Sequence, residues 1–254
     1  MYYTSTTMYY LSVLAIFKNE TMNLKVWLDH YIWQGVEHFY LIDNGSTDNP
    51  MEILQEYIDK GFVTYVYGDA KHRQQQYYKD VFNLFRLKEK TFWLAVCDLD
   101  EFLFGTQKRL SKVLQTHEKY NMVLSNWLMF GSDGLIEHPT DIRTAIIHRE
   151  ESIHVNTKYI FKTNSIPNTD PIWIHRLENV DDTFTFVDND QIRLNHYPIQ
   201  SLDFFQKVKM TRGAADVYWC ENIRDMNYFN SYDQNKTYKD LLLPNLISNP
   251  PEDY

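Results

Sequence analysis

The chain has little cysteine and little positive charge, and it has no hydrophobic run long enough to cross a bilayer. Cys97 and Cys220 are the two cysteines in 254 residues, too few for a disulfide framework, which indicates a reducing compartment. The formal net charge of −9 argues against surfaces for nucleic acid or anionic membranes, which need basic patches. The apolar run at 8–17 is too short for a membrane span and follows no basic segment. We expect a cytoplasmic protein with no transmembrane segment and no nucleic-acid partner.

Strand-like and helix-like patterns alternate along the first hundred residues. Hydrophobic residues make up 44% of the chain, enough to bury the core of one large domain. Strands are predicted at 9–17, 36–43, 62–67 and 92–98, and helices at 19–35, 50–61 and 73–90. This alternation is typical of a parallel sheet wrapped by helices. We therefore predict an α/β fold with one domain at 1–230 and a C-terminal extension at 231–254.

Three carboxylates follow the fourth predicted strand, in the sequence "FWLAVCDLDEFLF". Buried carboxylates are costly unless they are paired or bind a cation, and no Lys or Arg is adjacent to them in the sequence. Alternate residues of an extended segment face the same side, so Asp98 and Asp100 can converge while Leu99 points to the core. This pattern predicts a site for Mg²⁺ or Mn²⁺, which would carry a diphosphate. Glu101 is expected to face the other way, where it caps a turn or makes an ion pair.

Polar side chains also follow the first two predicted strands. Lys18, Asn19 and Glu20 come after the first strand, and Asp43 and Asn44 come after the second. Ligands of open α/β sheets bind beyond the carboxyl ends of the strands. These residues are therefore candidates for the same site as the carboxylates. For Asp43 the alternative is a structural role in capping the turn that follows it.

Several distinctive motifs occur in order between about residues 13 and 213. They are "IFKNETMNLKVWLDHYIWQGVEHFYLIDNGSTDN", a glutamine-rich patch, "DLDEF", "WLMFGSDG" and "LNHYPIQSLDFFQKVKMTRG". Together they resemble the family 92 glycosyltransferases and their bacterial family 2-like relatives. The resemblance implies a GT-A fold, a nucleotide-sugar donor that is usually a UDP sugar, a glycan or glycoconjugate acceptor, and inversion at the anomeric carbon.

The resemblance also implies roles for individual residues. Segment 16–20 and the pair Asp43–Asn44 correspond to the pocket for the base and ribose of the donor. Asp98 and Asp100 correspond to the metal and ribose dyad, with Asp100 as the direct metal ligand. His196 corresponds to a C-terminal histidine that completes the metal site, although a core histidine bonded to a carbonyl is the alternative. An imidazole beside carboxylates favours Mn²⁺ over Mg²⁺.

The polar stretch "KHRQQQYYKD" lies where the third predicted helix begins. Helix N-termini and nearby cations attract phosphates. Arg73 and Gln76, together with Gln74 and Lys79, are therefore candidates for contacts with the donor diphosphate. A solvated helix face explains the same residues without a ligand.

Three further residues are candidates for contacts with the sugars. Trp127 and Phe130 precede a turn flanked by glycines, and flat aromatic faces pack well on the apolar faces of sugars. Lys158 corresponds to a lysine of the family pattern. Core packing of the two aromatic residues and a surface position of the lysine are the alternatives.

An inverting transfer needs a carboxylate that takes the proton of the acceptor hydroxyl. Asp133, within "FGSDG", is the first candidate for this general base, and Glu178, Asp181 and Asp182 are the reserves. A structural turn position is the alternative for Asp133.

Two other classes of protein remain open. A metal-dependent phosphohydrolase acting on a nucleotide or sugar phosphate would also use an acid pair after a strand. A glycan-binding module without catalysis would keep the aromatic residues and would not need Asp98 and Asp100.

Overall fold

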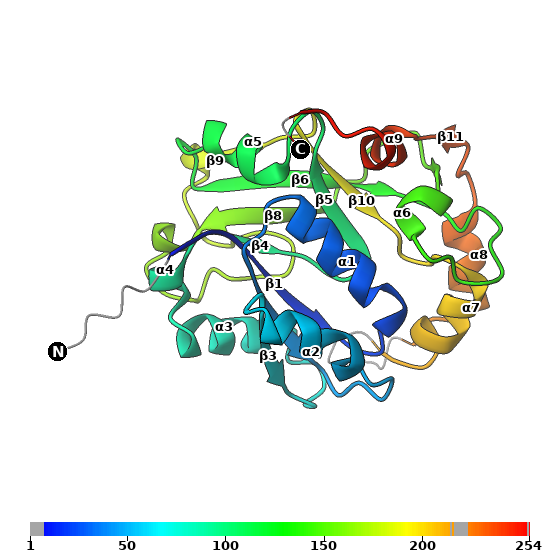
Figure 1. Ribbon diagram of the computed structural model, residues 1–254, viewed down its shortest axis with the longest axis horizontal. Helices are drawn as coiled ribbons and strands as arrows, with labels where there is room; N and C mark the ends of the chain where they lie inside the picture. The colour runs from blue at the N-terminus through cyan, green and yellow to red at the C-terminus, as the bar shows by residue number, and fades with distance from the viewer. Residues whose placement is uncertain (1–7, 214, 216–222, 253) are drawn as a thin grey trace.

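A mixed β-sheet forms the centre of the protein (Figure 1). The computed structural model describes residues 8–213, 215, 223–252 and 254. Within this part of the chain, nine strands form one sheet in the order β3-β2-β1-β4-β8-β6-β10-β5, with β9 paired to β6. The strands are β1 (Tyr9–Phe17), β2 (His38–Asp43), β3 (Val63–Tyr67), β4 (Thr91–Val96), β5 (Glu101–Gly105), β6 (Met122–Met129), β8 (Thr157–Lys162), β9 (Thr185–Val187) and β10 (Ile192–His196).

The pairing divides the sheet into a parallel half and a mixed half. β1 pairs in parallel with β2 and β4, and β3 pairs in parallel with β2. β8 then runs antiparallel to both β4 and β6, and β10 pairs in parallel with β6 and antiparallel with β5. The predicted α/β fold, with a mostly parallel central sheet flanked by helices, is therefore confirmed.

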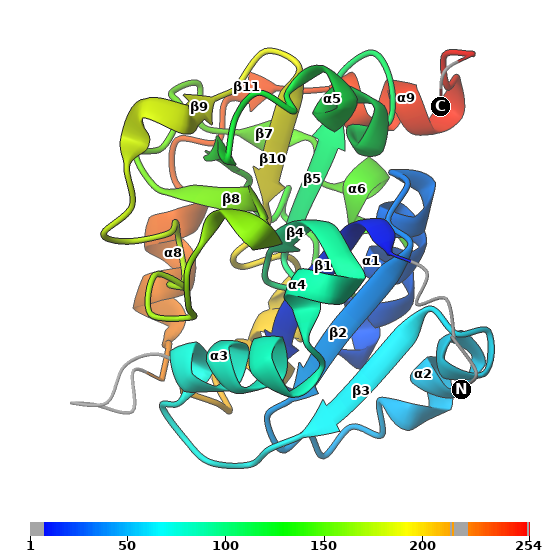
Figure 2. The same cartoon turned by 90° about the vertical axis from the view of Figure 1, so that its left-hand side faces the viewer.

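Helices cover both faces of the parallel half, and Figure 2 shows α2 and α3 on either side of β2 and β3. The main helices are α1 (Thr21–Trp33), α2 (Met51–Asp59), α3 (Gln74–Leu84), α4 (Leu87–Lys90) and α5 (Leu110–Thr116). Leu11 and Val13 of β1 share one hydrophobic core with α1, α2 and α5. Leu14 and Ile16 share the other core with α3 and α4, because alternate residues of a strand point to opposite faces.

The segment 73–90, predicted as one helix, contains the two helices α3 and α4. Arg86 between them has a left-handed backbone conformation, with φ of 55°. A left-handed residue cannot continue a right-handed helix. No Gly or Pro interrupts this segment, so the sequence pattern alone does not show the break.

The start of α1 is held by the loop after β2. Glu20 is the residue at the cap position, and its side chain makes no capping bond. Asp48 Oδ2 instead accepts hydrogen bonds from the backbone nitrogen and hydroxyl of Thr21, at 2.9 and 2.8 Å. Asn19 Oδ1 accepts from the backbone nitrogen of Thr47 at 2.7 Å. The loops that follow β1 and β2 are thus tied together at the carboxyl edge of the sheet.

The C-terminal part of the chain packs on the rest of the protein. β11 (Tyr238–Lys239) pairs with β7 (His148–Arg149), and α9 (Leu242–Ser248) packs on Phe104 of β5. The remaining helical elements are α6 (Ile142–Ala145), η1 (Thr163–Ser165), η2 (Asp182–Phe184), α7 (Leu202–Phe204), the π-helical turn η3 (Phe205–Lys209) and α8 (Met226–Asp233). The boundary at residue 230 stays a prediction.

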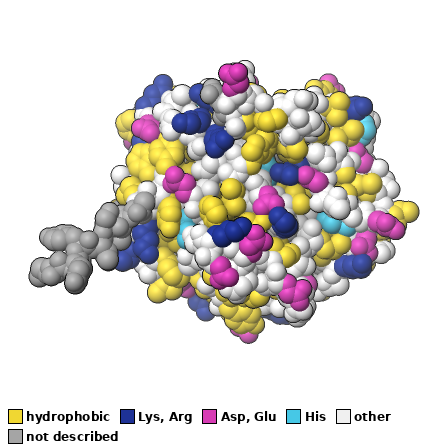
Figure 3. Space-filling model, viewed as in Figure 1, with side chains coloured by type: hydrophobic (Ala, Val, Ile, Leu, Met, Phe, Trp, Pro, Cys, Tyr) yellow, Lys and Arg dark blue, Asp and Glu magenta, His cyan; other side chains and the backbone are white. Residues whose placement is uncertain are grey.

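The surface in Figure 3 carries acidic and basic side chains interspersed with one another over the face that is drawn. That face therefore has no broad basic patch of the kind that binds nucleic acid. Among the helices of the described residues, none is long and apolar enough to cross a membrane.

Candidate active site

Two adjoining cavities lie beyond the carboxyl ends of β1 and β4, with volumes of about 250 and 300 Å³. We name them the Asn44 cavity and the Asp100 cavity after one lining residue of each. Both are lined by Ile16, Arg212, Gly213 and Ala215, so they form one continuous cleft. Its position is the one expected for the ligand site of an open α/β sheet.

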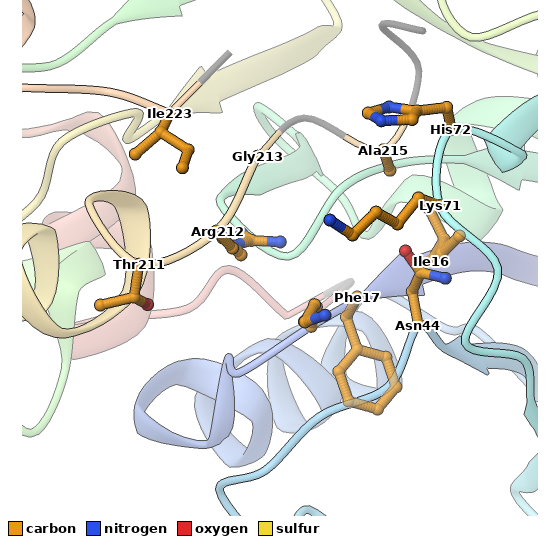
Figure 4. A pocket seen from close by; sticks show the side chains of 11 residues that line it. Ile16, Phe17, Asn44, Lys71, His72, Thr211, Arg212, Gly213, Ala215 and Ile223 are labelled. Carbon is orange, nitrogen blue, oxygen red and sulfur yellow. The ribbon is translucent and has the colours of Figure 1, made fainter. Parts of the chain in front are cut away.

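Basic and amide side chains line the Asn44 cavity (Figure 4). Lys71 and Arg212 extend toward one another across it. Lys18 also lines this cavity. Asn44 Nδ2 donates to the carbonyl oxygens of Gly68 and Ala70, at 2.7 and 3.1 Å. These two bonds fix the Asn44 side chain at the floor of the cavity.

Asp100 lies in the Asp100 cavity between a lysine and a histidine. Its Oδ2 is 2.7 Å from Lys209 Nζ, and its Oδ1 is 3.6 Å from His196 Nε2. Burial acts to raise the pKa of Asp100, but the charges of Lys209 and His196 and the hydrogen bonds from both hold this pKa well below its usual value. Asp100 is therefore ionised at neutral pH.

A second carboxylate, Glu101, lies beside Asp100 at the start of β5. Its strand pairs antiparallel with β10, which places Glu101 opposite His196. Asp100, Glu101 and His196 offer one ligand atom each within 4.8 Å of one another. Within the described part of the chain, Glu101 Oε1 and His196 Nδ1 are buried without a hydrogen-bond partner. This donor set fits a divalent cation, since carboxylates and imidazole are common ligands of divalent metal ions in proteins.

Asp98 does not join this group, although we predicted that it converges with Asp100. Its Oδ2 is 2.8 Å from Lys158 Nζ, and its Oδ1 accepts a long hydrogen bond of 3.4 Å from Gln74 Nε2. Leu99 between the two aspartates is buried, as expected. The Asp98 side chain keeps 33% of its surface exposed and lines the Asp100 cavity.

Lys158 lies beneath the site and supplies the positive charge that the sequence around the carboxylates lacks. Its side chain is completely buried, and Nζ is 3.5 Å from Glu101 Oε2 as well as 2.8 Å from Asp98. Glu101 Oε2 also accepts from the backbone nitrogen of Asp98 at 2.8 Å, so it caps this turn as predicted. Burial raises the pKa of Glu101 to about 8 against the opposing charge of Lys158. Lys158 therefore positions the carboxylates, and it does not line the cleft as a sugar-binding residue would.

Glu20 brings a further carboxylate and a further cation to the Asp100 cavity. Its Oε1 is 3.7 Å from Lys209 Nζ and forms an ion pair with Arg212. Burial raises the pKa of Glu20, and the charges of Lys209 and Arg212 oppose this shift. Glu20, Asp100, Lys209 and Arg212 thus form a compact group of two acids and two bases, which we name the charge quartet.

Aromatic side chains line the Asp100 cavity beyond the charge quartet. Trp127 packs on His196 with ring centroids 4.3 Å apart. Tyr228 and Tyr232 of α8 stack on each other, also at 4.3 Å. All four residues line the cavity. Phe130, the other predicted sugar contact, is buried against Tyr197 at 4.7 Å and belongs to the core.

Two other residues that we predicted to contact the nucleotide-sugar donor form hydrogen bonds within the protein instead. Asp43 is buried and accepts from the Ser46 backbone at 2.7 Å and from the Tyr65 hydroxyl at 2.8 Å. This is the turn-capping geometry that we weighed as its alternative. Gln76 is exposed and bonds to Asp80 at 2.7 Å, as a solvated helix face requires.

Gln74 is the member of the polar stretch that reaches the cleft. It is buried, lines the Asp100 cavity and donates to the Tyr78 hydroxyl at 2.8 Å. Arg73 occupies the cap position of α3 and is exposed. Neither Arg73 nor Asn19 is among the residues that line the two cavities.

Asp133 lies outside both cavities, in a turn with a left-handed backbone (φ 52°). Its carboxylate accepts from the backbone nitrogens of Ile147 and His148, at 2.8 and 3.2 Å, and is 3.1 Å from His148 Nδ1. These bonds tie the turn at Asp133 to the start of β7. The reserve acids Glu178, Asp181 and Asp182 are exposed and line neither cavity. The general-base assignment of Asp133 stays a prediction without support from the geometry.

We expect Asp133→Asn to lower the melting temperature and to change kcat by no more than a few-fold. The amide cannot accept all three hydrogen bonds of the carboxylate, because one of its two terminal atoms is a donor. A general base would give the reverse pattern, with kcat lower by about 10²–10⁴ and a normal melting temperature. Thermal melts and initial rates on the same preparation distinguish the two roles, and Asp190→Asn, on another loop, is the control.

Sequence reasoning missed Lys209, Arg212 and the two tyrosines of α8. Lys209 and Arg212 do occur in the last quoted motif, "QKVKMTRG", so that motif was the available signal for them. Their pairing with Asp100 and Glu20 joins residues far apart in the chain and leaves no local pattern. Tyr228 and Tyr232 follow the last recognised motif, and nothing in the sequence distinguishes them from core aromatic residues.

The mixed α/β sheet and the charged cleft at the carboxyl ends of its parallel strands agree with the GT-A fold of nucleotide-sugar transferases. The profile of glycosyltransferase family 92 matches residues 8–242, which is most of the chain. The chain belongs to glycosyltransferase family 92.

No curated protein matches the chain significantly. Among solved structures, S. aureus TarS 1–349 is 14% identical over 95% of this chain and 72% of its own, with a TM-score of 0.49. The same values hold for that fragment in complex with UDP. A putative glucose-1-phosphate thymidylyltransferase from Bacillus anthracis, in complex with a sucrose, is 11% identical over 84% of this chain and 98% of its own, with a TM-score of 0.48.

Proposed function

We propose that this glycosyltransferase moves a sugar, with inversion, from a UDP sugar to a hydroxyl group of a glycan or glycoconjugate. We further propose that it uses a divalent cation, Mn²⁺ in preference to Mg²⁺. The observation that carries the proposal is the charge quartet, because it brings carboxylates and cations together on one cleft. Such a cleft suits a substrate that is an anionic diphosphate accompanied by a metal.

The donor would occupy both cavities. Lys18, Lys71 and Arg212 line the Asn44 cavity and would attract the diphosphate, as cations attract phosphate oxygens. Asn44 lies on the same cavity and would contact the nucleoside. Asp98 exposes part of its carboxylate to the adjoining cavity and can accept a hydrogen bond from a ribose hydroxyl.

Asp100, Glu101 and His196 would hold the cation, with Asp100 as the ligand that is already ionised and directed at the cleft. A cation bound there would neutralise the charge that grows on the departing diphosphate. The imidazole of His196 among carboxylates favours Mn²⁺. Trp127 packs on His196 and would shield this side of the site from water.

The acceptor would approach along the aromatic side of the Asp100 cavity. Trp127, Tyr228 and Tyr232 offer flat faces there for packing on a sugar ring. The acceptor oxygen would attack the anomeric carbon opposite the diphosphate, the bond to the diphosphate oxygen would break, and a carboxylate would take the hydroxyl proton. The acids that line this cavity among the described residues are Glu20, Asp98 and Asp100.

We expect UDP to stabilise the protein more in Mn²⁺ than in EDTA. A ligand at 100 times its Kd adds about 2.7 kcal/mol to the free energy of unfolding. For a chain of this size that corresponds to a rise in melting temperature of roughly 5–10 °C. Thermal melts with UDP alone, with Mn²⁺ alone and with both together measure this rise in melting temperature. UMP, which lacks the second phosphate, is the control ligand. Equal stabilisation by UDP in Mn²⁺ and in EDTA would contradict the metal assignment.

The products distinguish the proposed reaction from the two other classes. Release of UDP together with transfer of the sugar supports the glycosyltransferase. Release of inorganic phosphate would indicate a phosphohydrolase, and glycan binding without turnover would indicate an inactive binding module. One screen of UDP and GDP sugars with mixed glycan acceptors, analysed by mass spectrometry, separates these outcomes.

A further inference from the structure

Lys209 occupies an unusual position for a lysine, because it is buried at the cleft and bonded to the proposed metal ligand. Its side chain is 8% exposed, with Nζ 2.7 Å from Asp100 Oδ2 and 3.7 Å from Glu20 Oε1. Lys207, two residues earlier, is 65% exposed and pairs with Asp203 at 2.7 Å. Two lysines of the same turn therefore have opposite environments.

The backbone around Lys209 explains how it reaches Asp100. The turn η3 is π-helical, and the backbone nitrogen of Met210 bonds to the carbonyl of Phe205, five residues back, at 2.9 Å. Such turns are rare and occur frequently at functional sites, since the extra residue changes which side chains face inward. Here the residue that faces inward is a cation.

The charge quartet is balanced as it stands. The carboxylates of Glu20 and Asp100 compensate the ammonium of Lys209 and the guanidinium of Arg212. Adding a divalent cation alone would leave an excess of buried positive charge, and adding a diphosphate alone would leave an excess of negative charge. Uncompensated buried charge is strongly unfavourable. Adding both restores the balance.

We propose that Lys209 couples metal binding to donor binding by exchanging partners. In the ligand-free protein its ammonium holds Asp100. When Asp100 takes the metal, the ammonium passes to an oxygen of the donor diphosphate. This inference rests on the proposed function, because it needs a diphosphate donor and a cation at Asp100. It makes Lys209 a positioning residue that disfavours binding of the metal without the nucleotide.

The test is to titrate wild type and Lys209→Met with Mn²⁺ in the absence of nucleotide. Electron paramagnetic resonance measures the concentration of free Mn²⁺ at each step. We expect the variant to bind Mn²⁺ without nucleotide about tenfold or more tightly, because no buried ion pair has to be broken first. We expect UDP to raise the Mn²⁺ affinity of wild type by about 5–150-fold, the usual range of coupling between sites. In Lys209→Met this factor should be smaller than in wild type, because only the attraction between the metal and the diphosphate remains, and UDP binding should weaken.

Lys207→Met is the matched control, since it removes an exposed lysine from the same turn and should leave both affinities unchanged. Lys209→Gln gives a second variant if the methionine prevents folding, because its amide can still donate to Asp100 without a charge. Mn²⁺ binding by the folded variant that is no tighter than in wild type would overturn the inference, and so would wild-type Mn²⁺ affinity that is independent of UDP.

The failure of this inference is distinguishable from failure of the proposed function. If wild type transfers sugar from a UDP sugar but shows no coupling, the role of Lys209 is wrong and the function stands. If wild type neither binds UDP nor transfers sugar, the function is wrong. The titration with Mn²⁺ alone then still decides whether Lys209 competes with a metal for Asp100.

Discussion

Asp100→Asn should lower kcat by about 10²–10³, the range seen when one electrostatic contact to developing negative charge is removed. The carboxylate is the proposed metal ligand nearest the reacting diphosphate, and the amide is a weak ligand for a hard cation. Asp100→Ala should abolish transfer. Initial rates with a UDP sugar and Mn²⁺ measure both effects.

The two variants at this position should differ in stability. Asp100 is paired with Lys209 at 2.7 Å, and both side chains are nearly buried. Alanine leaves the ammonium with Glu20 at 3.7 Å as its remaining acidic partner, whereas asparagine still accepts a hydrogen bond from it. We expect Asp100→Ala to melt lower than Asp100→Asn. Asp203→Asn, which removes the half-buried carboxylate paired with the exposed Lys207, is the control.

Wild-type turnover in a folded Asp100→Asn would rule out this residue as a metal ligand. A lower kcat that Mn²⁺ restores at high concentration would instead support it, since a weakened site fills when more metal is present. The family assignment would survive either result, because it rests on the match over residues 8–242.

The parallel half of the sheet could be predicted from the sequence because its signals are local. Each strand is one short apolar run, and α1 and α2 are each one periodic segment between a polar turn and a glycine. The positive backbone φ of Gly35 and Gly61, 86° and 78°, agrees with the predicted ends of α1 and α2. The carboxyl edge of that sheet, and hence the location of the cleft, follows from the strand order alone.

The electrostatics of the site could not be predicted in the same way. The sequence showed three carboxylates without a neighbouring cation and therefore suggested that a metal supplies the charge. The structure shows that the chain supplies much of it, since Lys158 and Lys209 reach Asp98 and Asp100 from 60 and 109 residues away. These partners meet through antiparallel pairing of β8 with β4 and through the turn η3. Both are long-range features without a local signature.

The contacts of Asp133 illustrate a related limit. The local sequence of a single Asp between Ser and Gly is the same whether the side chain contacts a ligand or stabilises a turn. The deciding contacts, to Ile147 and His148, join this turn to the start of β7, and no sequence periodicity relates the two segments. The sequence indicates that the general base should be a carboxylate. The fold determines which of the acidic residues line the cleft.

Lys158→Met should destabilise the protein by about 3–5 kcal/mol at neutral pH, the usual cost of removing one partner from a buried ion pair. The Lys158 side chain is completely buried and is ion-paired with both Asp98 and Glu101. Urea unfolding measures the change. Lys162→Met on the same strand is the control, because that lysine bonds a carbonyl oxygen of Glu118 rather than a buried carboxylate.

Adding Glu101→Gln to Lys158→Met should recover part of this loss as the pH approaches 8, because it removes one of the two acids whose ionisation Lys158 compensates in wild type. The pH dependence gives an independent check. The pKa of Glu101 is raised from 4.5 to about 8 in the folded protein, so the unfolded chain releases this proton first as the pH rises. Its contribution to stability is therefore present below pH 4.5 and is lost as the pH rises toward 8. Lys158→Met raises this pKa further and should steepen the loss, whereas Glu101→Gln should flatten it. A single variant whose stability equals that of wild type at pH 8, or a double variant no more stable than the single one, would show that Lys158 does not compensate these carboxylates.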